Sequence, residues 1–301
     1  MIGDRGAGKG ESSEETSIRQ LLIEATRLLQ EEGLDTPRLD AEVLLGHVLG
    51  LTRAQIHAHL GRRLDAAELE SYYELVERRR QHEPVAYIIG HKEVYGLDFY
   101  VNQRVLIPRP ETELLVEKGL EIGRAASHPL TIADVGTGCG AMAISLAVYL
   151  PQAIIYALDA SSEALEVTAL NCRRYRLEKH VHLVQGDLLL PLPELVDLIV
   201  ANLPYVSGAE WEQWPRTIAA YEPRFALDGG PDGLDAIRRL LAQVRSHLKP
   251  QATILLEIGA TQGAAEANLA RRHFPAATVG VVQDYAGLDR MVVIEIQADS
   301  R

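Results

Sequence analysis

The sequence predicts an α/β fold in which a doubly wound, seven-stranded sheet follows a small helical domain and a β-hairpin. Two observations predict this fold. After Thr112, apolar runs of strand length alternate with amphipathic runs of helix length, which is typical of a parallel sheet covered by helices on both faces. Before about residue 84, the apolar residues recur with helical spacing alone.

The pattern divides the chain into four predicted segments. They are a disordered lead-in at 1–15, a helical domain at 16–84 that is suited to be an adaptor for a partner, a hairpin linker at 85–111 and the sheet domain at 112–301. The lead-in contains a near match to a phosphate-binding loop between Gly3 and Gly10. That loop needs a preceding strand and a final Ser or Thr, which are both missing, so we expect no nucleotide site there.

Residues that favour helix starts and hairpin turns mark the elements of the first half. The expected helix starts are Ser17 with Gln20, Thr36 with Pro37, and Asp65 with Glu68. Residues 87–102 alternate around Gly96 and Asp98 as in a hairpin.

The second half contains the sheet. Strands are expected near 130–135, 153–159, 181–187, 197–202, 253–258, 277–283 and 291–297, and helices near 141–150, 162–176, 234–248 and 262–273. About thirty residues rich in Trp, Pro and Gly separate the fourth strand from the next helix, far more than an ordinary connection, and such a loop usually belongs to a site.

The composition and charge exclude several classes of protein. The 301 residues are 47% hydrophobic and 24% charged, as in a globular protein of about two domains. The formal net charge of −12 opposes sequence-independent binding to nucleic acid or anionic lipid, so neither partner is expected. No run approaches the ~18 apolar residues of a membrane span, no secretory signal is evident, and two cysteines provide no disulfide framework. We therefore expect a cytoplasmic protein.

A glycine-rich turn follows the first strand of the sheet, where doubly wound folds bind cofactors. It consists of Gly136, Thr137, Gly138, Cys139 and Gly140. Its spacing is GxGxG, whereas the dinucleotide fingerprint is GxGxxG, and no histidine near a strand end suits a nicotinamide dehydrogenase. A cofactor without phosphate needs only the backbone clearance that the glycines give. A tight turn without a ligand is the alternative.

Acidic residues end three neighbouring strands of the predicted sheet. Asp159 closes the second strand, where a carboxylate binds ribose hydroxyls, and Asp187 closes the third, where it could meet an adenine amino group. Asp134 lies at the end of the first. Each one alone is equally consistent with a helix cap, but Ser161 is able to cap the helix after Asp159.

The fourth strand leads into Asn202, Leu203, Pro204 and Tyr205. Pro204 holds the preceding residue extended, so the Leu203 carbonyl and the Asn202 side-chain oxygen form a pair of acceptors. Such a pair suits a planar NH₂ group, which an adjacent aromatic ring can cover. The alternative is a turn stabilised by the Asn side chain.

These motifs resemble those of the release-factor glutamine methyltransferases (HemK/PrmC), which are class I S-adenosylmethionine-dependent enzymes. The resemblance spans about residues 20–297 and includes VLIPRPETE at 105–113, EP at 222–223, ALDGG at 226–230, DGL at 232–234, LEIG at 256–259 and DYAGLDR at 284–290. One departure stands out, because the family has Asn-Pro-Pro-Tyr where this chain has Leu203 in second place.

The resemblance implies a Rossmann-like methyltransferase sheet and a protein-methylating role in translation termination. The implied reaction transfers a methyl group to the glutamine amide of the Gly-Gly-Gln motif of release factors, without a metal. The implied cofactor-binding residues are Gly136, Thr137, Gly138, Cys139, Gly140, Asp159, Asp187, Leu188 and Asn202. The implied catalytic and substrate-binding residues are Asn202, Leu203, Pro204 and Tyr205, and Arg109, Glu111 and Thr112 are expected to close the pocket.

Two other functions remain open from the sequence. A nucleic-acid methyltransferase acting on the adenine amino group would use the same acceptor pair on a flipped base, but the net charge of −12 disfavours it. A binding module without catalysis would not need the Asn202 acceptor pair.

Overall fold

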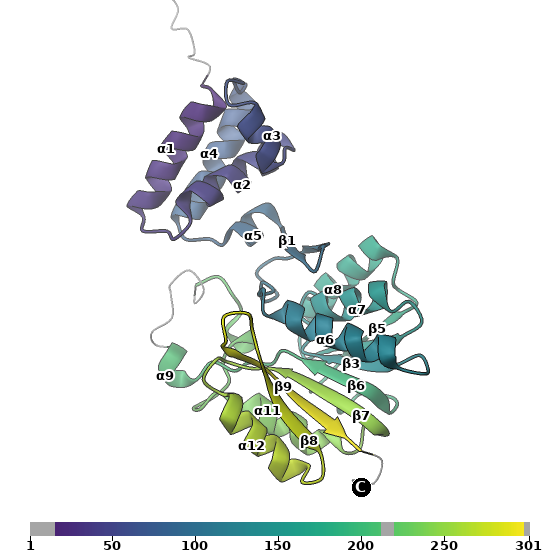
Figure 1. Cartoon of the computed structure of the whole chain (residues 1–301). Helices are drawn as coiled ribbons and strands as arrows, with labels where there is room; N and C mark the ends of the chain where they lie inside the picture. Colours follow the sequence, from purple (N-terminus) through teal and green to yellow (C-terminus); the bar gives the residue numbers. More distant parts are fainter. Residues whose placement is uncertain (1–15, 212–219, 298–301) are drawn as a thin grey trace, which may run out of the picture. The chain divides into compact units, whose positions relative to one another are not determined.

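A computed structural model (Figure 1) describes residues 16–211 and 220–297 of the chain. The chain divides into two compact units between Ile89 and Gly90. The predicted lead-in at 1–15 lies outside the described residues. The predicted linker at 85–111 is split by this division, because its first residues form a helix of the first unit and its hairpin belongs to the second.

The first unit is a bundle of short helices around one apolar core. Its helices are α1 (Ile18–Glu31), α2 (Pro37–Leu49), α3 (Arg53–Ala58), α4 (Ala66–Arg80) and α5 (Val85–Ile89). The predicted capping box at Ser17 and Gln20 is confirmed, since each residue's side chain accepts a hydrogen bond from the other's backbone N–H. The same geometry begins α4 at Asp65 and Glu68. These caps satisfy backbone donors that a helix start otherwise leaves unpaired.

The predicted hairpin is confirmed and opens the second unit. Strands β1 (His91–Val94) and β2 (Leu97–Tyr100) pair antiparallel across the turn residues Tyr95 and Gly96. Both turn residues have positive φ, as two-residue hairpin turns of this hand require.

The predicted seven-stranded, doubly wound sheet is also confirmed. Its strands are β3 (Thr131–Val135), β4 (Ile154–Asp159), β5 (Val181–Gln185), β6 (Val196–Ala201), β7 (Leu248–Glu257), β8 (Thr278–Gln283) and β9 (Asp289–Ile296), in the order β5-β4-β3-β6-β7-β9-β8. The expectation of a parallel sheet is wrong for β9, which is antiparallel to both neighbours. A short turn joins β8 to β9, whereas a parallel connection needs a crossover of a dozen or more residues.

Helices cover both faces of the sheet, with α6, α7 and α8 on one side and α11 and α12 on the other (Figure 1). Their bounds are α6 (Thr112–Ala125), α7 (Ala141–Tyr149), α8 (Ser162–Tyr175), α11 (Asp235–Val244) and α12 (Gly263–His273); the connection after β6 holds the short α9 (Gly208–Trp211) and η1 (Arg224–Ala226). Helix α6 was not among the predicted elements. The helix predicted at 234–248 ends earlier, because Leu248 already begins β7.

Among the described residues, no helix combines the length and the apolar composition that a membrane crossing requires.

The strand order places the site. Strand β3 pairs with β4 on one side and with β6 on the other, and the chain reverses its direction of travel across the sheet between β3 and β6. Because Val135 is in register with Ala201, the residues that follow these two strands leave the same edge together. Doubly wound sheets bind ligands in the crevice at such a reversal.

Glu266, on α12, is a fully buried acid. Its side chain is 0% exposed, and neither carboxylate oxygen has a hydrogen-bond partner in the described parts of the chain. Burial raises the pKa of Glu266 to about 8. The folded protein thus keeps a proton that the unfolded chain releases near pH 4.5, so stability falls as the pH rises through this window.

We therefore expect Glu266→Gln to flatten the pH dependence of stability. Between about pH 5 and pH 8, the parent should lose on the order of 3 kcal/mol of unfolding free energy relative to the variant. Urea denaturation of both proteins at several pH values measures this difference. Parallel pH profiles would show that Glu266 ionises normally.

Candidate functional site

A cavity of about 280 Å³ lies at the carboxyl edge of the sheet, beyond the ends of β3, β4 and β6. Most of the sequence-predicted site residues line it. These are Gly136, Thr137, Gly138, Cys139, Asp159, Asp187, Leu188, Asn202, Leu203 and Pro204. Apolar side chains, including Met142, Leu158 and Phe225, complete much of its wall.

The Gly-rich loop (residues 136–140) wraps closely around one end of the cavity. Its first two backbone N–H groups donate to the Leu158 carbonyl at 2.9 Å, and the Gly138 N–H donates to the Asp159 carboxylate at 3.0 Å. Gly138 has φ +58°, and no atom lies within 4 Å of the place where a Cβ would stand. The loop therefore presents bare backbone to the cavity.

Gly140 is the one member of the loop that does not line the cavity. It has φ +85°, and a Cβ there would stand 2.7 Å from the Thr168 methyl group on α8. The structure thus gives Gly140 a packing function at the start of α7.

Two residues of the expected site region are deeply buried. Asp134 accepts hydrogen bonds from the Thr137 hydroxyl (2.7 Å) and the Ala143 N–H (3.0 Å) and does not line the cavity. Only two of the three acidic strand ends therefore reach it. Burial raises the pKa of Asp134 to about 7 and that of the Cys139 thiol to about 12, so Cys139 is an unreactive, neutral thiol.

Asp159 holds the loop as well as facing the cavity. One of its oxygens accepts the Gly138 N–H, and the other accepts the Ser161 N–H at 2.9 Å. Burial raises its pKa above the usual value. Ser161 caps α8 by itself, as predicted, by accepting the Ala164 N–H. Lone pairs of Asp159 that these bonds do not use remain for a ligand.

Both arginines of the cavity wall are paired with acids. Arg239, on α11, forms an ion pair with Asp187, and Arg104 binds Glu166 on α8 at 2.7 Å. Sequence reasoning did not identify either arginine, because each meets its acid only through the fold. The cavity thus presents no unpaired cation to a ligand within the described residues.

Asn202 is oriented by a chain of two hydrogen bonds. The buried Thr112 hydroxyl donates to the Glu257 carboxylate at 2.8 Å, and the Asn202 amide nitrogen donates to that hydroxyl at 3.4 Å. A hydroxyl has one proton, so a Thr112 that donates to Glu257 must accept from Asn202. The Asn202 oxygen is thereby turned away from Thr112, and no described residue donates to it.

Burial raises the pKa of Glu257 to about 7, and the Thr112 hydrogen bond opposes that rise. Glu257 was part of a quoted motif but had no predicted role, since 145 residues separate it from Thr112. Burial next to this carboxylate also raises the pKa of Tyr205, so its phenol stays neutral.

The predicted tetrapeptide is divided between two cavities. A smaller cavity of about 80 Å³ is lined by Tyr205 and Arg109 and shares Asn202 with the larger one. The Leu203 side chain is buried, with a methyl group 3.1 Å from the Cβ position of Gly136. Asn202 therefore lies where the two cavities adjoin, whereas Leu203 and Pro204 line only the larger cavity and Tyr205 only the smaller one.

The backbone of Tyr205 is fixed by a hydrogen bond from Gln262 and lies close to Gly233. The Gln262 amide donates to the Tyr205 carbonyl at 2.8 Å, and a Cβ on Gly233 would stand 2.3 Å from that oxygen. Only glycine fits this close approach.

Of the three residues expected to close the pocket, Arg109 lines the smaller cavity, Thr112 lines the larger one, and Glu111 lines neither. Arg109 forms an ion pair with the buried Glu222, which also accepts the Ile107 N–H at 3.2 Å. Glu111 lies 3.4 Å from Arg290 on β9. No group of three or more His, Cys, Asp or Glu among the described residues is arranged to hold a metal ion.

Comparisons with known proteins agree over nearly the whole chain. The family model of the PrmC N-terminal domain matches residues 20–90, and that of the methyltransferase small domain matches residues 112–220. A release factor glutamine methyltransferase from Moorella thermoacetica is 46% identical over 276 residues, which cover 91% of this chain and 96% of that protein. One from Chlorobaculum tepidum is 38% identical and covers 91% of this chain and 95% of its own length.

The solved structure of a methyltransferase from Pyrococcus furiosus shares the fold. It is 17% identical, with a TM-score of 0.52 over 73% of this chain and 97% of that one. Identity of 46% across nine-tenths of the chain decides the family. The chain belongs to the release factor glutamine methyltransferase family.

Proposed function

We propose that the protein transfers a methyl group from S-adenosylmethionine to the side-chain amide nitrogen of the glutamine in the Gly-Gly-Gln motif of peptide chain release factors. The observation that carries this proposal is the orientation of Asn202, which offers an oxygen acceptor at the junction of two cavities. The names of the relatives support release factors as the substrate.

The larger cavity would hold S-adenosylmethionine. Gly136, Thr137, Gly138 and Cys139 would hold its methionine part, with Gly140 supporting the loop. Asp159 would bind its ribose, and Asp187 and Leu188 would flank its adenine. Bare backbone, apolar walls and the absence of an unpaired cation among the described residues suit a cofactor without phosphate groups. When bound, this cofactor supplies an electrophilic methyl group on a positively charged sulfur.

The chain's own residues must make an amide nitrogen reactive. That nitrogen is a poor nucleophile, because its lone pair is delocalised into the carbonyl. The Asn202 oxygen and the Leu203 carbonyl would accept its two N–H bonds, fix its direction and stabilise the positive charge that develops on it. Pro204 and Tyr205 would complete the substrate clamp. The methylated amide cation loses its proton readily, so no dedicated base is needed.

The helical unit would contact the release factor away from the methylated glutamine. We infer that the protein acts in the cytoplasm, where its substrate is found.

An adenine-methylating enzyme is not favoured. It would use the same acceptor pair, but the relatives are named for release factors, and the net charge of −12 opposes nucleic-acid binding.

The substrate is tested by incubating the protein with labelled S-adenosylmethionine. We expect label in a purified release factor and none when the glutamine of its Gly-Gly-Gln motif is replaced by alanine. Ribosomal RNA and DNA serve as controls and should remain unlabelled. Label in either nucleic acid, with none in the release factor, would contradict the proposal.

Asn202→Ala removes one of the two acceptors. We expect a loss of roughly 3 kcal/mol of transition-state stabilisation, about a hundredfold or more in rate. Single-turnover methyl transfer measures it. The matched variant Leu203→Pro keeps the carbonyl and should stay within about tenfold of the parent. Near-normal transfer by Asn202→Ala would locate the acceptor pair elsewhere.

Thr112→Val keeps the volume of the side chain but removes the hydroxyl whose hydrogen bonds orient Asn202. We expect kcat to fall about tenfold while the KM for the release factor changes little, because the variant misorients an acceptor rather than removing a binding surface. Thr112→Ser retains the hydroxyl and should restore kcat. Equal loss in both variants would mean that packing, and not the hydroxyl, matters at this position.

A further inference from the structure

Asn171, on α8, binds two distant segments with one side chain. The side chain is 0% exposed. Its amide nitrogen donates to the carbonyls of Tyr100 (3.0 Å) and Cys139 (2.8 Å), and its oxygen accepts the Tyr100 N–H at 2.8 Å. Both donors of the amide are therefore used. Its partners lie 71 and 32 residues away along the chain.

The two segments form different parts of the cavity wall. Cys139 belongs to the Gly-rich loop. Tyr100 ends β2, just before the wall segment (residues 104–108), which contributes Arg104, Val105, Leu106 and Pro108 to the cavity. Thr168, one turn earlier on α8, donates to the Gly138 carbonyl at 2.8 Å. Helix α8 thus holds two successive carbonyls of the loop.

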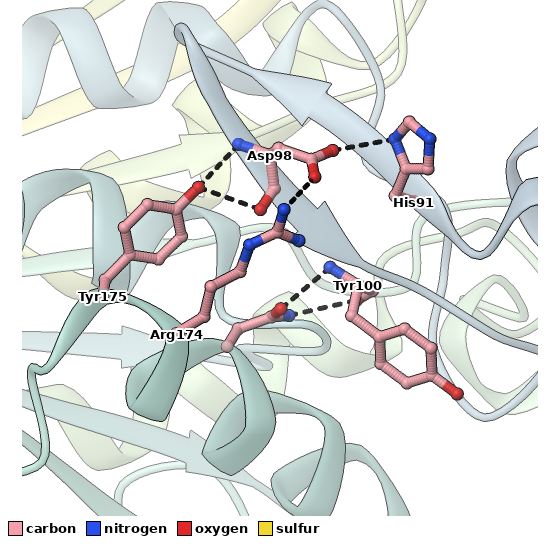
Figure 2. Close-up of polar contacts among 6 residues, drawn as sticks. His91, Asp98, Tyr100, Arg174 and Tyr175 are labelled. Atoms are coloured by element: carbon pink, nitrogen blue, oxygen red, sulfur yellow. Dashed lines mark hydrogen bonds and ion pairs between the residues drawn. The ribbon is translucent and has the colours of Figure 1, made fainter. Parts of the chain in front are cut away.

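Other bonds between the hairpin and α8 do not reach the loop (Figure 2). The Tyr175 hydroxyl accepts the Asp98 N–H at 2.7 Å and donates to the Asp98 carbonyl at 2.9 Å. The Asp98 carboxylate meets Arg174 and the His91 ring. The bonds from Tyr175 and Arg174 fasten the same hairpin to the same helix, whereas the contact between Asp98 and His91 lies within the hairpin. Removing the Tyr175 hydroxyl therefore loosens the hairpin from α8 without breaking its connection to the Gly-rich loop.

We propose that Asn171 is a positioning residue for cofactor binding, an inference that rests on the proposed function. Its amide sets the spacing between the Gly-rich loop and the wall segment. Without that amide, the carbonyls of Tyr100 and Cys139 lose buried donors, and the loop must find new partners for them. Cofactor binding would then have to restore an arrangement that the parent already holds.

The test measures S-adenosylmethionine binding by calorimetry and methyl transfer to a release factor. Asn171→Ala should raise the cofactor Kd about tenfold or more. At saturating cofactor, kcat should stay within about threefold and the release-factor KM within about twofold, since the acceptor pair at Asn202 is untouched. Asn171→Asp has nearly the same shape but turns oxygen toward two carbonyls, so it should weaken binding at least as much.

Tyr175→Phe is the matched control. It removes the hydroxyl bonds to Asp98 but leaves the loop fastened, so the cofactor Kd should stay within about twofold of the parent. Thermal unfolding monitors the fold of every variant. Parent-like binding by the Asn171 variants, or equal weakening by Tyr175→Phe, would overturn the proposal.

If the Asn171 variants do not fold, Thr168→Val tests the same idea. It keeps the side-chain shape and removes the donor to the Gly138 carbonyl, so the cofactor Kd should rise several-fold. Parent-like binding by a folded Thr168→Val would likewise overturn the proposal. A parent that binds no S-adenosylmethionine would contradict the proposed function instead.

Discussion

The direction of one side-chain amide is the constraint on which the rest of the site depends. Asn202 can turn its oxygen away from Thr112 only while its nitrogen faces that residue, and Thr112 accepts that nitrogen because its own proton goes to Glu257. Helix α6 supplies the hydroxyl, β7 supplies the carboxylate, and Asn202 directly follows the end of β6. Two elements of the sheet and one covering helix are therefore needed to orient a single acceptor.

The burial of Glu257 helps to keep the Thr112 hydroxyl in this orientation. In water, a carboxylate would exchange hydrogen-bond partners freely. In the interior, the Glu257 carboxylate keeps its bond to the Thr112 hydroxyl. The cost is a pKa raised to about 7 by burial. Gln262, which holds the Tyr205 carbonyl, fixes the other end of the tetrapeptide in a similar way.

Features encoded within a few residues were predictable from the sequence. The capping boxes, the hairpin turn, the Gly-rich loop and the positions of the strands along the chain all depend on local patterns. The partners of Thr112, Asn171 and Arg239 depend on residues 145, 71 and 52 positions away, respectively, and no local pattern marks them. Gly140 illustrates the limit, because the motif identifies the glycine but only the fold shows that it packs against Thr168.

The hairpin also follows the helical unit along the chain and is itself fixed to three helices. Its turn is tied to α6 by Glu113, which accepts the Tyr95 N–H, and to α7 by Tyr149, whose hydroxyl donates to the Tyr95 carbonyl. Its second strand is tied to α8 by Asn171. The covalent path from the helical unit to the wall segment runs through this anchored hairpin. A displacement of the helical unit can therefore reach the wall segment along the backbone only through a hairpin that is fixed to three helices.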